Sequence, residues 1–216
     1  PLNMIIGFSE MITQAPETYG VPLPPALLAD IAVIQRNSQH LASLVNDVLD
    51  LSQVEAGRMA LSKEWISLRE VVEAAAVAVR PLYETKGLSL DWEIPKDVPS
   101  VLADRTRIRQ VVLNLLSNAG RFTERGGVRV RVEPKEHEVV IAVSDTGPGI
   151  SPENQKRLFE PFEQLDGSLS RKHGGSGLGL SISRRFVEVH GGKMWVESEV
   201  GRGTTFYFSL PLDQSL

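Results

Sequence analysis

Glycine is distributed very unevenly along this chain, and this unevenness constrains the fold more than any other feature. The chain has 216 residues and 18 glycines, of which 14 lie between Gly120 and Gly203. Glycine permits positive φ angles and close backbone approach, and it weakens helices. We therefore expect a helical N-terminal part with few loops and a C-terminal part whose glycine loops can hold a ligand.

The N-terminal part carries apolar residues at helical spacing. Residues 2–15 are apolar on a wide helical face, and four prolines between residues 15 and 25 should end that helix and form a loop. A second helix is expected over residues 26–56, with a seam that alternates spacings of four and three at Leu27, Ile31, Ile34, Ser38, Leu41, Val45 and Val48. Such seams pack in bundles or coiled coils. Because two helices bury the seam poorly, we expect a homodimer in which two antiparallel hairpins form a four-helix bundle.

From Leu61 onward the pattern becomes mixed, which places a domain boundary near residue 60. Three helices are predicted at 67–87, 104–119 and 178–190, the first opened by a capping box at Ser67 and kinked or shortened by Pro81. Strands are predicted at 61–66, 88–94, 128–132, 139–143, 193–198 and 204–210, the third and fourth of them paired as a hairpin. Helices grouped beside a mixed sheet indicate an α+β fold. The polar segment 160–176 is predicted to be a mobile lid.

Composition excludes several classes of function. A formal net charge of −4 does not indicate binding to nucleic acid or to an anionic membrane surface, both of which favour a basic protein. The absence of cysteine excludes disulfides, thiolate metal sites and a cysteine nucleophile, and it fits a reducing compartment. No apolar run approaches the roughly 18 residues of a membrane span, so we expect a cytoplasmic domain without membrane contact. The sequence starts at Pro1 in mid-pattern, so we expect it to be a fragment of a longer protein, and it does not reveal whether that protein is membrane-anchored.

The first candidate site is the segment Asp145-Thr146-Gly147-Pro148-Gly149-Ile150, which follows a buried strand. Two glycines around a proline predict a tight turn whose backbone can approach a ligand closely. A carboxylate at the end of an apolar strand needs a hydrogen-bond donor, and an amino group on a flat ring would supply one. A plain turn, in which Asp145 accepts backbone N–H groups, explains the motif equally well.

The second candidate is a pair of asparagines in the helix predicted at 104–119. Asn114 and Asn118 are four residues apart and share one face. A carboxamide oxygen is a hard ligand suited to Mg²⁺, which bridges phosphates, although hydrogen bonding to the backbone is the alternative. Arg121 would clamp a phosphate or lie at the surface, and Phe122 would line a base pocket or belong to the core.

Two glycine-rich segments complete the set. The segment before the last predicted helix can present successive N–H groups to an anion, aided by the helix dipole; alternatively it is a flexible hinge. It reads Gly174-Gly175-Ser176-Gly177-Leu178-Gly179-Leu180 and lacks the Lys-Ser/Thr of a P-loop. The turn at Gly201-Arg202-Gly203 is followed by Thr204, whose hydroxyl would lie near a base unless the segment is only a turn between strands.

In this order the motifs resemble those of the sensor histidine kinases: Asn114…Asn118, Asp145-x-Gly147-x-Gly149, Phe159-x-x-Phe162, Gly175-x-Gly177-Leu178-Gly179-Leu180 and Gly201-x-Gly203-Thr204. The resemblance covers nearly the whole chain. It implies a dimerisation hairpin at 1–60 and, at 61–216, a catalytic domain with the two-layer α/β sandwich of the Bergerat or GHKL type. It also implies an ATP site formed by Asn114, Asn118, Arg121, Phe122, Asp145, Gly147, Gly149, Gly175, Gly177, Leu178, Gly179, Leu180 and Thr204.

The resemblance implies specific roles within that site. Asp145 would accept from the adenine amino group, Asn118 would bind Mg²⁺, and Asn114 would lie beside the phosphates. Arg121 stands where the family usually has Lys, which keeps the charge and changes the hydrogen-bonding geometry. The implied function is transfer of the ATP γ-phosphoryl group to a His and then to an Asp of a response-regulator receiver domain.

The phosphoacceptor His of the family is not found in this sequence. The family motif places it five residues before a proline, and the chain begins at that proline. None of the four histidines matches the motif: His40, His137, His173 and His190. His190 is predicted to end a helix, where a cation is favoured. We expect nucleotide binding without autophosphorylation. Alternatives are an ATP-hydrolysing relative, which would carry Glu at Asn114, and a nucleotide-gated interaction module without kinase activity.

Overall fold

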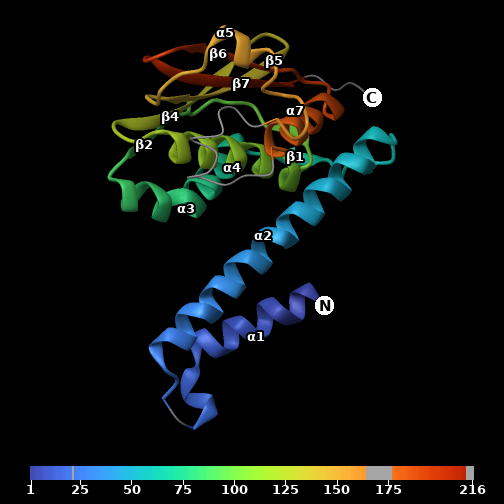
Figure 1. Ribbon diagram of the computed structural model, residues 1–216. Coiled ribbons are helices and arrows are strands. Elements are labelled where there is room, and N and C mark those ends of the chain that lie inside the picture. The colour runs from blue at the N-terminus through green and yellow to red at the C-terminus, as the bar shows by residue number, and fades with distance from the viewer. Residues whose placement is uncertain (21, 164–176, 213–216) are drawn as a thin grey trace. The chain divides into compact units, whose positions relative to one another are not determined.

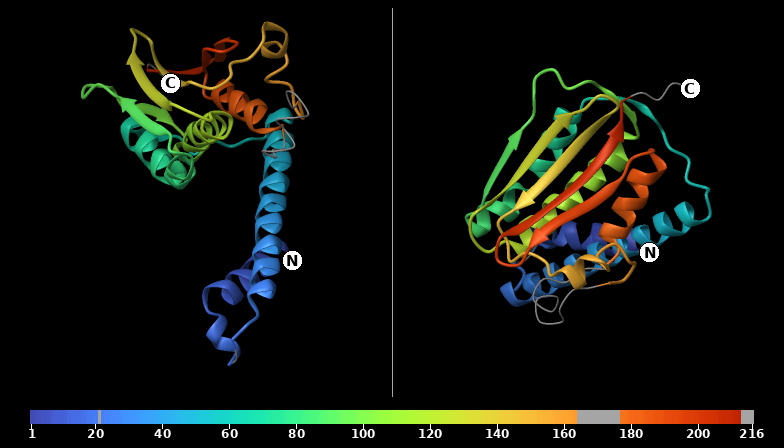
Figure 2. Two further views of the ribbon diagram at one scale, coloured as in Figure 1. Left: turned by 60° about the vertical axis from the view of Figure 1, so that its left-hand side comes forward. Right: turned by 90° about the horizontal axis from the view of Figure 1, so that it is seen from above.

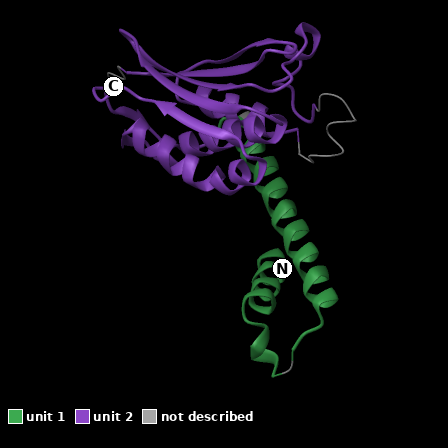
Figure 3. Ribbon diagram, turned by 90° about the vertical axis from the view of Figure 1, so that its left-hand side faces the viewer, with its two compact units in different colours: residues 1–57 green, residues 58–216 purple. Residues whose placement is uncertain are grey.

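The computed structural model describes residues 1–20, 22–163 and 177–212, and it divides into two compact units (Figure 3). The first unit comprises residues 1–57 and the second comprises residues 58–216. The sequence expectation of a lid at 160–176 falls mainly on residues outside the described part of the chain.

The first unit is the predicted helical hairpin. Helix α1 (Leu2–Gln14) folds back on the long helix α2 (Pro25–Glu55), which starts with proline in its first turn (Figure 1). The loop between them contains a 3₁₀ turn, η1 (Pro16–Tyr19), which the sequence did not predict. Among the described residues of this unit only Ser9 and Ser38 are buried, whereas seam residues such as Ile34 and Leu41 are 51% exposed. Within the first unit, the hairpin therefore does not bury its own apolar seam.

The second unit is built on a five-stranded sheet in the order β2-β4-β5-β7-β6. The strands are β2 (Ser89–Glu93), β4 (Gly127–Pro134), β5 (Glu138–Asp145), β6 (Met194–Glu199) and β7 (Gly203–Pro211). β2 and β4 are parallel, and all other pairs are antiparallel, including the two predicted hairpins β4–β5 and β6–β7. A separate two-stranded sheet joins β1 (Glu64–Ile66) to β3 (Val101–Ala103), and this second strand was not expected from the sequence.

Helices cover one face of the sheet and make the second layer (Figures 1 and 2). They are α3 (Leu68–Lys86), α4 (Arg105–Phe122) and α7 (Gly179–Val189), while the short α5 (Pro152–Gln155) follows β5. The Ser67 hydroxyl accepts from Glu70 N at 3.4 Å, as the capping box predicts. The expectation that Pro81 shortens α3 is wrong, because the helix continues to Lys86. Burial of Tyr83 beyond the proline holds that last turn in place.

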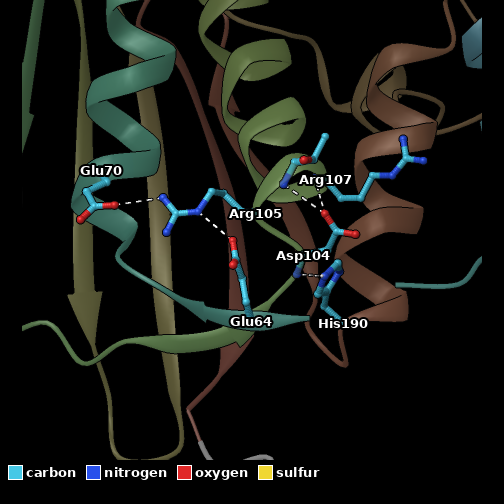
Figure 4. A network of polar contacts seen from close by, with 7 residues as sticks. Glu64, Glu70, Asp104, Arg105, Arg107 and His190 are labelled. Atoms are coloured by element: carbon cyan, nitrogen blue, oxygen red, sulfur yellow. Dashed lines mark hydrogen bonds and ion pairs between the residues drawn. The ribbon is translucent and has the colours of Figure 1, made fainter. Parts of the chain in front are cut away.

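A buried polar cluster joins the start of α4 to the end of α7 (Figure 4). Asp104 caps α4 by accepting from Thr106 N at 3.0 Å and Arg107 N at 3.1 Å, and its other oxygen accepts from Ser62 N at 3.0 Å. The backbone N–H of Asp104 donates to His190 Nε2 at 3.0 Å, and His190 Nδ1 donates to Phe186 O at 2.6 Å. These two contacts require the neutral imidazole with its hydrogen on Nδ1.

His190 is therefore not the helix-end cation that the sequence suggested. Its side chain is 1% exposed, and burial lowers its pKa more than the Phe186 carbonyl raises it. The helix-dipole argument applies to exposed termini, whereas desolvation dominates for a buried imidazole.

We predict that acid destabilises the second unit through His190. In the unfolded chain the imidazole takes up a proton near its ordinary pKa of 6.5, while the folded pKa is lower. The contribution of His190 is thus fully present above that pH and is lost as the pH falls, by at most about 1.4 kcal/mol per pH unit. Urea unfolding between about pH 7.5 and pH 5, followed by tryptophan fluorescence, measures this, since Trp65, Trp92 and Trp195 all lie in the second unit.

The matched variant is His190→Gln, because an amide can also accept from Asp104 N and donate to Phe186 O without titrating. The free energy of unfolding of this variant should fall less steeply with acid than that of the parent chain. Identical pH slopes for the two proteins would show that His190 does not cause the acid sensitivity.

Candidate functional site

The segment after β5 forms a tight turn centred on Asp145. One Asp145 carboxylate oxygen accepts from Gly147 N at 2.8 Å, so the turn includes the self-capping contact of the plain-turn alternative. Burial raises the pKa of the Asp145 carboxyl, and the backbone N–H groups of Gly147 and Thr204 lower it by less. The carboxylate is thus half-buried, and these backbone donors do not fully offset its desolvation.

The glycines of this turn are required by close backbone contacts. Gly149 has a φ of 72°, and a Cβ there would lie 2.0 Å from Glu199 O. A Cβ at Gly147 would lie 2.8 Å from the Asp145 carboxylate. Gly149 therefore excludes larger residues for steric reasons, whereas a side chain at Gly147 would displace the Asp145 carboxylate.

Three hydrogen bonds fix the turn to its surroundings. Thr146 Oγ1 donates to Arg125 O at 3.0 Å and so joins the turn to the α4–β4 loop. Pro148 O accepts from Gly201 N at 2.7 Å, and Ile150 N donates to Ser198 Oγ at 2.8 Å. The turn is therefore held on both sides by rigid elements, which a precise ligand contact requires.

The two asparagines of α4 lie on one face, half-buried, as predicted. Asn118 Nδ2 donates to Asn114 Oδ1 at 3.4 Å, and Asn114 Nδ2 donates to the buried Ser183 hydroxyl on α7 at 2.9 Å. These contacts join side chains, in contrast to the backbone bonding considered as the alternative. A Cβ at Gly179 would lie 2.5 Å from Asn114 Oδ1, so the start of α7 passes directly over Asn114.

The Asp145 turn and the asparagine face meet along α4. A Cβ at Gly147 would lie 3.5 Å from Phe122 O and 3.4 Å from Thr123 Oγ1, which places the turn against the end of α4. Thr123 is five positions beyond Asn118, an axial separation of roughly 7 Å. The Thr123 hydroxyl is fully buried and has no hydrogen-bond partner among the described residues.

Three further residues of the predicted site differ in burial and in position. Thr204 is buried and lies opposite Asp145 in the β5–β7 register. Phe122 is 41% exposed, so the alternative that its ring belongs to the core is wrong. Arg121 lies in the last turn of α4, which continues to Phe122, three residues beyond the predicted end of the helix.

The glycine-rich segment is described only from Gly177 onward, and Gly175 lies outside the described residues. Gly177 has a φ of 70°, and its carbonyl accepts from Phe162 N at 3.1 Å. Leu178 is 1% exposed, so its side chain is a core residue and only its backbone can face a ligand. Gly179 and Leu180 form the first turn of α7, where backbone N–H groups lack helical partners.

Two supporting residues of α3 had no distinctive sequence signal. Lys86 Nζ donates to the carbonyls of Gly120 at 2.9 Å, Arg121 at 2.6 Å and Thr123 at 3.1 Å, and so caps α4 beside the turn. Tyr83 donates to Leu116 O at 2.8 Å, and its ring fills the space that a Cβ at Gly120 would need. Burial and, to a smaller extent, the nearby Asp145 carboxylate raise the pKa of Tyr83.

Two negative observations apply to the described part of the chain. It contains no cluster of three His, Cys, Asp or Glu side chains suited to a metal ion. Within residues 1–20, 22–163 and 177–212, no helix has the length and apolar character needed to traverse a lipid bilayer.

Comparison with known families matches both units. Residues 103–214, just over half of the chain, match the family described as histidine kinase-, DNA gyrase B- and HSP90-like ATPase. Residues 1–57 match the His kinase A (phospho-acceptor) domain. The two matches follow the division into a hairpin and an α/β sandwich.

Individual proteins give the same result. The chain is 42% identical to histidine protein kinase DivJ of Caulobacter vibrioides over 98% of its length, and 36% identical to signal transduction histidine-protein kinase BarA of Escherichia coli over 99%. It covers 35% and 23% of those relatives, respectively. Full-length ShkA in complex with AMPPNP has a TM-score of 0.82 at 33% identity, covering 98% of this chain and 43% of that one. ThkA in complex with the response regulator TrrA has a TM-score of 0.68 at 26% identity, covering 96% and 59%. This chain therefore belongs to the sensor histidine kinases.

Proposed function

We propose that this chain is the kinase core of a two-component signalling protein and that it binds ATP with Mg²⁺ along α4. The observation that carries this proposal is the convergence of three features on that helix. The Asp145 turn contacts its C-terminal end, the Asn114–Asn118 face lies one to two turns earlier, and the start of α7 covers Asn114. The relationship to ShkA, a structure with bound AMPPNP, supports a nucleotide in this fold.

The adenine end of the proposed site is the Asp145 turn. The half-buried, desolvated Asp145 carboxylate is an acceptor that an exocyclic amino group can satisfy. Phe122, partly exposed at the end of α4, is available to line the base. Gly147 and Gly149 carry no side chain, which allows the backbone of the turn to lie close to Asp145 and Glu199.

The phosphate end is proposed to lie between Asn118 and α7. The Asn118 amide nitrogen already donates to Asn114, which leaves its carbonyl oxygen as the ligand that a hard cation prefers. A single amide ligand fits Mg²⁺, which keeps most of its coordination to phosphates and water, and the bound cation would offset phosphate charge. The N–H groups from Gly177 to Leu180, at and just before the start of α7, and the Arg121 guanidinium on α4 are proposed to receive the phosphate oxygens.

The proposed reaction is phosphoryl transfer by positioning and charge neutralisation. A neutral imidazole nitrogen attacks the γ-phosphorus in line, the bond to the bridging oxygen breaks, and ADP leaves. His40 is exposed on α2 and none of the four histidines matches the acceptor motif, so the acceptor is proposed to lie outside this sequence. The phosphoryl group then passes to an Asp of a receiver domain, in keeping with the ThkA–TrrA complex.

The two alternative functions find less support. An ATP-hydrolysing enzyme needs a base for water, whereas the Asn114 amide cannot take up a proton and is bonded to Ser183. A nucleotide-gated interaction module without kinase activity is not favoured, because the matching relatives are named histidine kinases.

The hairpin is proposed to form a homodimer through its exposed seam. Its two helices bury almost no apolar side chain within one chain, and an apolar seam of this length on an isolated helical pair marks an association surface. Packing two hairpins around the seam gives the four-helix bundle expected from the heptad pattern.

We predict that Asp145→Asn weakens ATP binding by roughly 10- to 100-fold, since the variant loses a charged acceptor and places an amide donor against the adenine amino group. Isothermal titration of the chain with MgATP measures the effect. The same substitution at Asp91, which is exposed on β2, is the matched control and should leave the affinity unchanged. Equal affinities for the two variants would place the base elsewhere.

We predict that Asn118→Ala selectively removes the contribution of Mg²⁺. ATP affinity measured with excess chelator should change little, while the gain on adding Mg²⁺ should shrink by about tenfold because one cation ligand is lost. Asn46→Ala, at an exposed position of α2, controls for the loss of an amide. An Asn118→Ala protein with an undiminished response to Mg²⁺ would exclude Asn118 as the ligand.

We predict that Leu41→Glu converts the dimer to monomer, because it buries a charge at the centre of the seam. Sedimentation equilibrium over a range of concentrations measures the change. Asn46→Glu introduces the same charge at an exposed position outside the seam and should leave the dimer intact. A parent chain that sediments as a monomer at all concentrations would refute the proposed bundle.

A further inference from the structure

Ser198, on β6, lies at the centre of a small polar cluster beside the proposed adenine end. Its hydroxyl oxygen lies 2.8 Å from Ile150 N, 2.9 Å from Gly203 O and 3.0 Å from Thr204 Oγ1. Ile150 is the last residue of the Asp145 turn, and Gly203 and Thr204 are the first two residues of β7. Ser198 belongs to none of the sequence motifs of the proposed ATP site.

The chemistry of the three neighbours fixes the direction of the hydrogen bonds. A hydroxyl has one hydrogen and two acceptor positions, while Ile150 N can only donate and Gly203 O can only accept. If Ser198 donates to Gly203 O, it accepts from both Ile150 N and the Thr204 hydroxyl, and all three contacts contain a hydrogen. If Ser198 donated to Thr204, its oxygen would face Gly203 O at 2.9 Å without a hydrogen between them, which is repulsive.

The Thr204 hydroxyl is therefore committed as a donor toward Ser198. The lone pairs of Thr204 Oγ1 are what remains for any further partner, so the hydroxyl can act toward a ligand only as an acceptor. Thr204 lies opposite Asp145 in the β5–β7 register, and its backbone N–H bonds to the Asp145 carboxylate. Two acceptors thus stand side by side at this end of the site.

We propose that Ser198 is a positioning residue that orients the Thr204 hydroxyl as an acceptor and thereby selects a base with an amino group over one with a carbonyl. The inference rests on the proposed function, in which the Asp145 turn binds the base of a nucleotide. An adenine amino group carries two hydrogens, one for each acceptor, whereas the corresponding guanine O6 is itself an acceptor. Guanine would leave Asp145 and Thr204 unpaired and opposed to a like group.

The test measures the dissociation constants of MgATP and MgGTP for the whole 216-residue chain and its variants. The parent chain should bind ATP more tightly than GTP. In Ser198→Ala the Thr204 hydrogen is released and can point at the ligand, so the preference for ATP should fall by about tenfold, the effect of one hydrogen bond. Ser198→Thr retains the hydroxyl and should retain the preference.

Gln155→Ala is the control for general loosening of the turn. Gln155 Nε2 donates to Ile150 O at 2.7 Å and to Ser198 O at 2.9 Å, so it supports the same turn without touching the Thr204 hydroxyl. Its loss should weaken ATP and GTP binding together and leave their ratio unchanged. A purely structural role of Ser198 would give the same result in Ser198→Ala.

A second pair of variants keeps the test valid if Ser198→Ala does not fold. Thr204→Val removes the acceptor with little change of shape and should lower the ratio as Ser198→Ala does, while Thr204→Ser should preserve it. An unchanged ratio in Ser198→Ala, or in Thr204→Val when Ser198→Ala is unfolded, overturns the inference while nucleotide binding by the parent chain stands. A parent chain that binds neither nucleotide overturns the proposed function itself.

Discussion

The interlocking of two glycine turns is the constraint on which the rest of the site depends. A Cβ at Gly149 would lie 2.0 Å from Glu199 O, and a Cβ at Gly203 would lie 2.0 Å from Asp145 O. Each turn therefore occupies the space that a side chain of the other would need. Because no flexible side chain separates the two backbones, the end of β5 is fixed relative to the β6–β7 turn. The orientation of Asp145 follows from that backbone contact and not from packing of its own side chain.

Helix α4 supplies the other fixed element, and it serves two environments at once. One face carries residues with no exposed surface, such as Val112 and Leu116, against the sheet and α3. The Asn114–Asn118 face looks toward α7, where the buried Ser183 accepts the Asn114 amide. The Lys86 ammonium group on α3 donates to carbonyl oxygens at the C-terminal end of α4. A cation is favoured at this end of a helix. Core packing and polar geometry are therefore set by the same eighteen-residue helix.

The sequence predicted the elements well wherever periodicity was strong, and less well where tertiary contacts decide. The β4–β5 and β6–β7 hairpins were confirmed because alternating apolar residues and glycine turns are local signals. Strand β3 has only three residues and exists through its pairing with β1, so no local pattern could reveal it. His190 illustrates the same limit, since its helix-end position was visible and its burial was not. No sequence motif points to Ser198 or Gln155, because both act through hydrogen bonds to residues distant in sequence.

The polar groups left under-satisfied near the Asp145 turn have a common physical meaning. A desolvated carboxylate and a buried threonine hydroxyl without a partner both cost folding free energy relative to apolar replacements. A scaffold selected only for stability would lose such groups, and a half-buried carboxylate such as that of Asp145 persists most readily where a bound molecule satisfies it. The surrounding structure is correspondingly rigid, with glycine-enforced backbone contacts and several hydrogen bonds to the turn. Because the cost is met when the protein folds, a nucleotide that fits gains contacts without having to reorganise the turn.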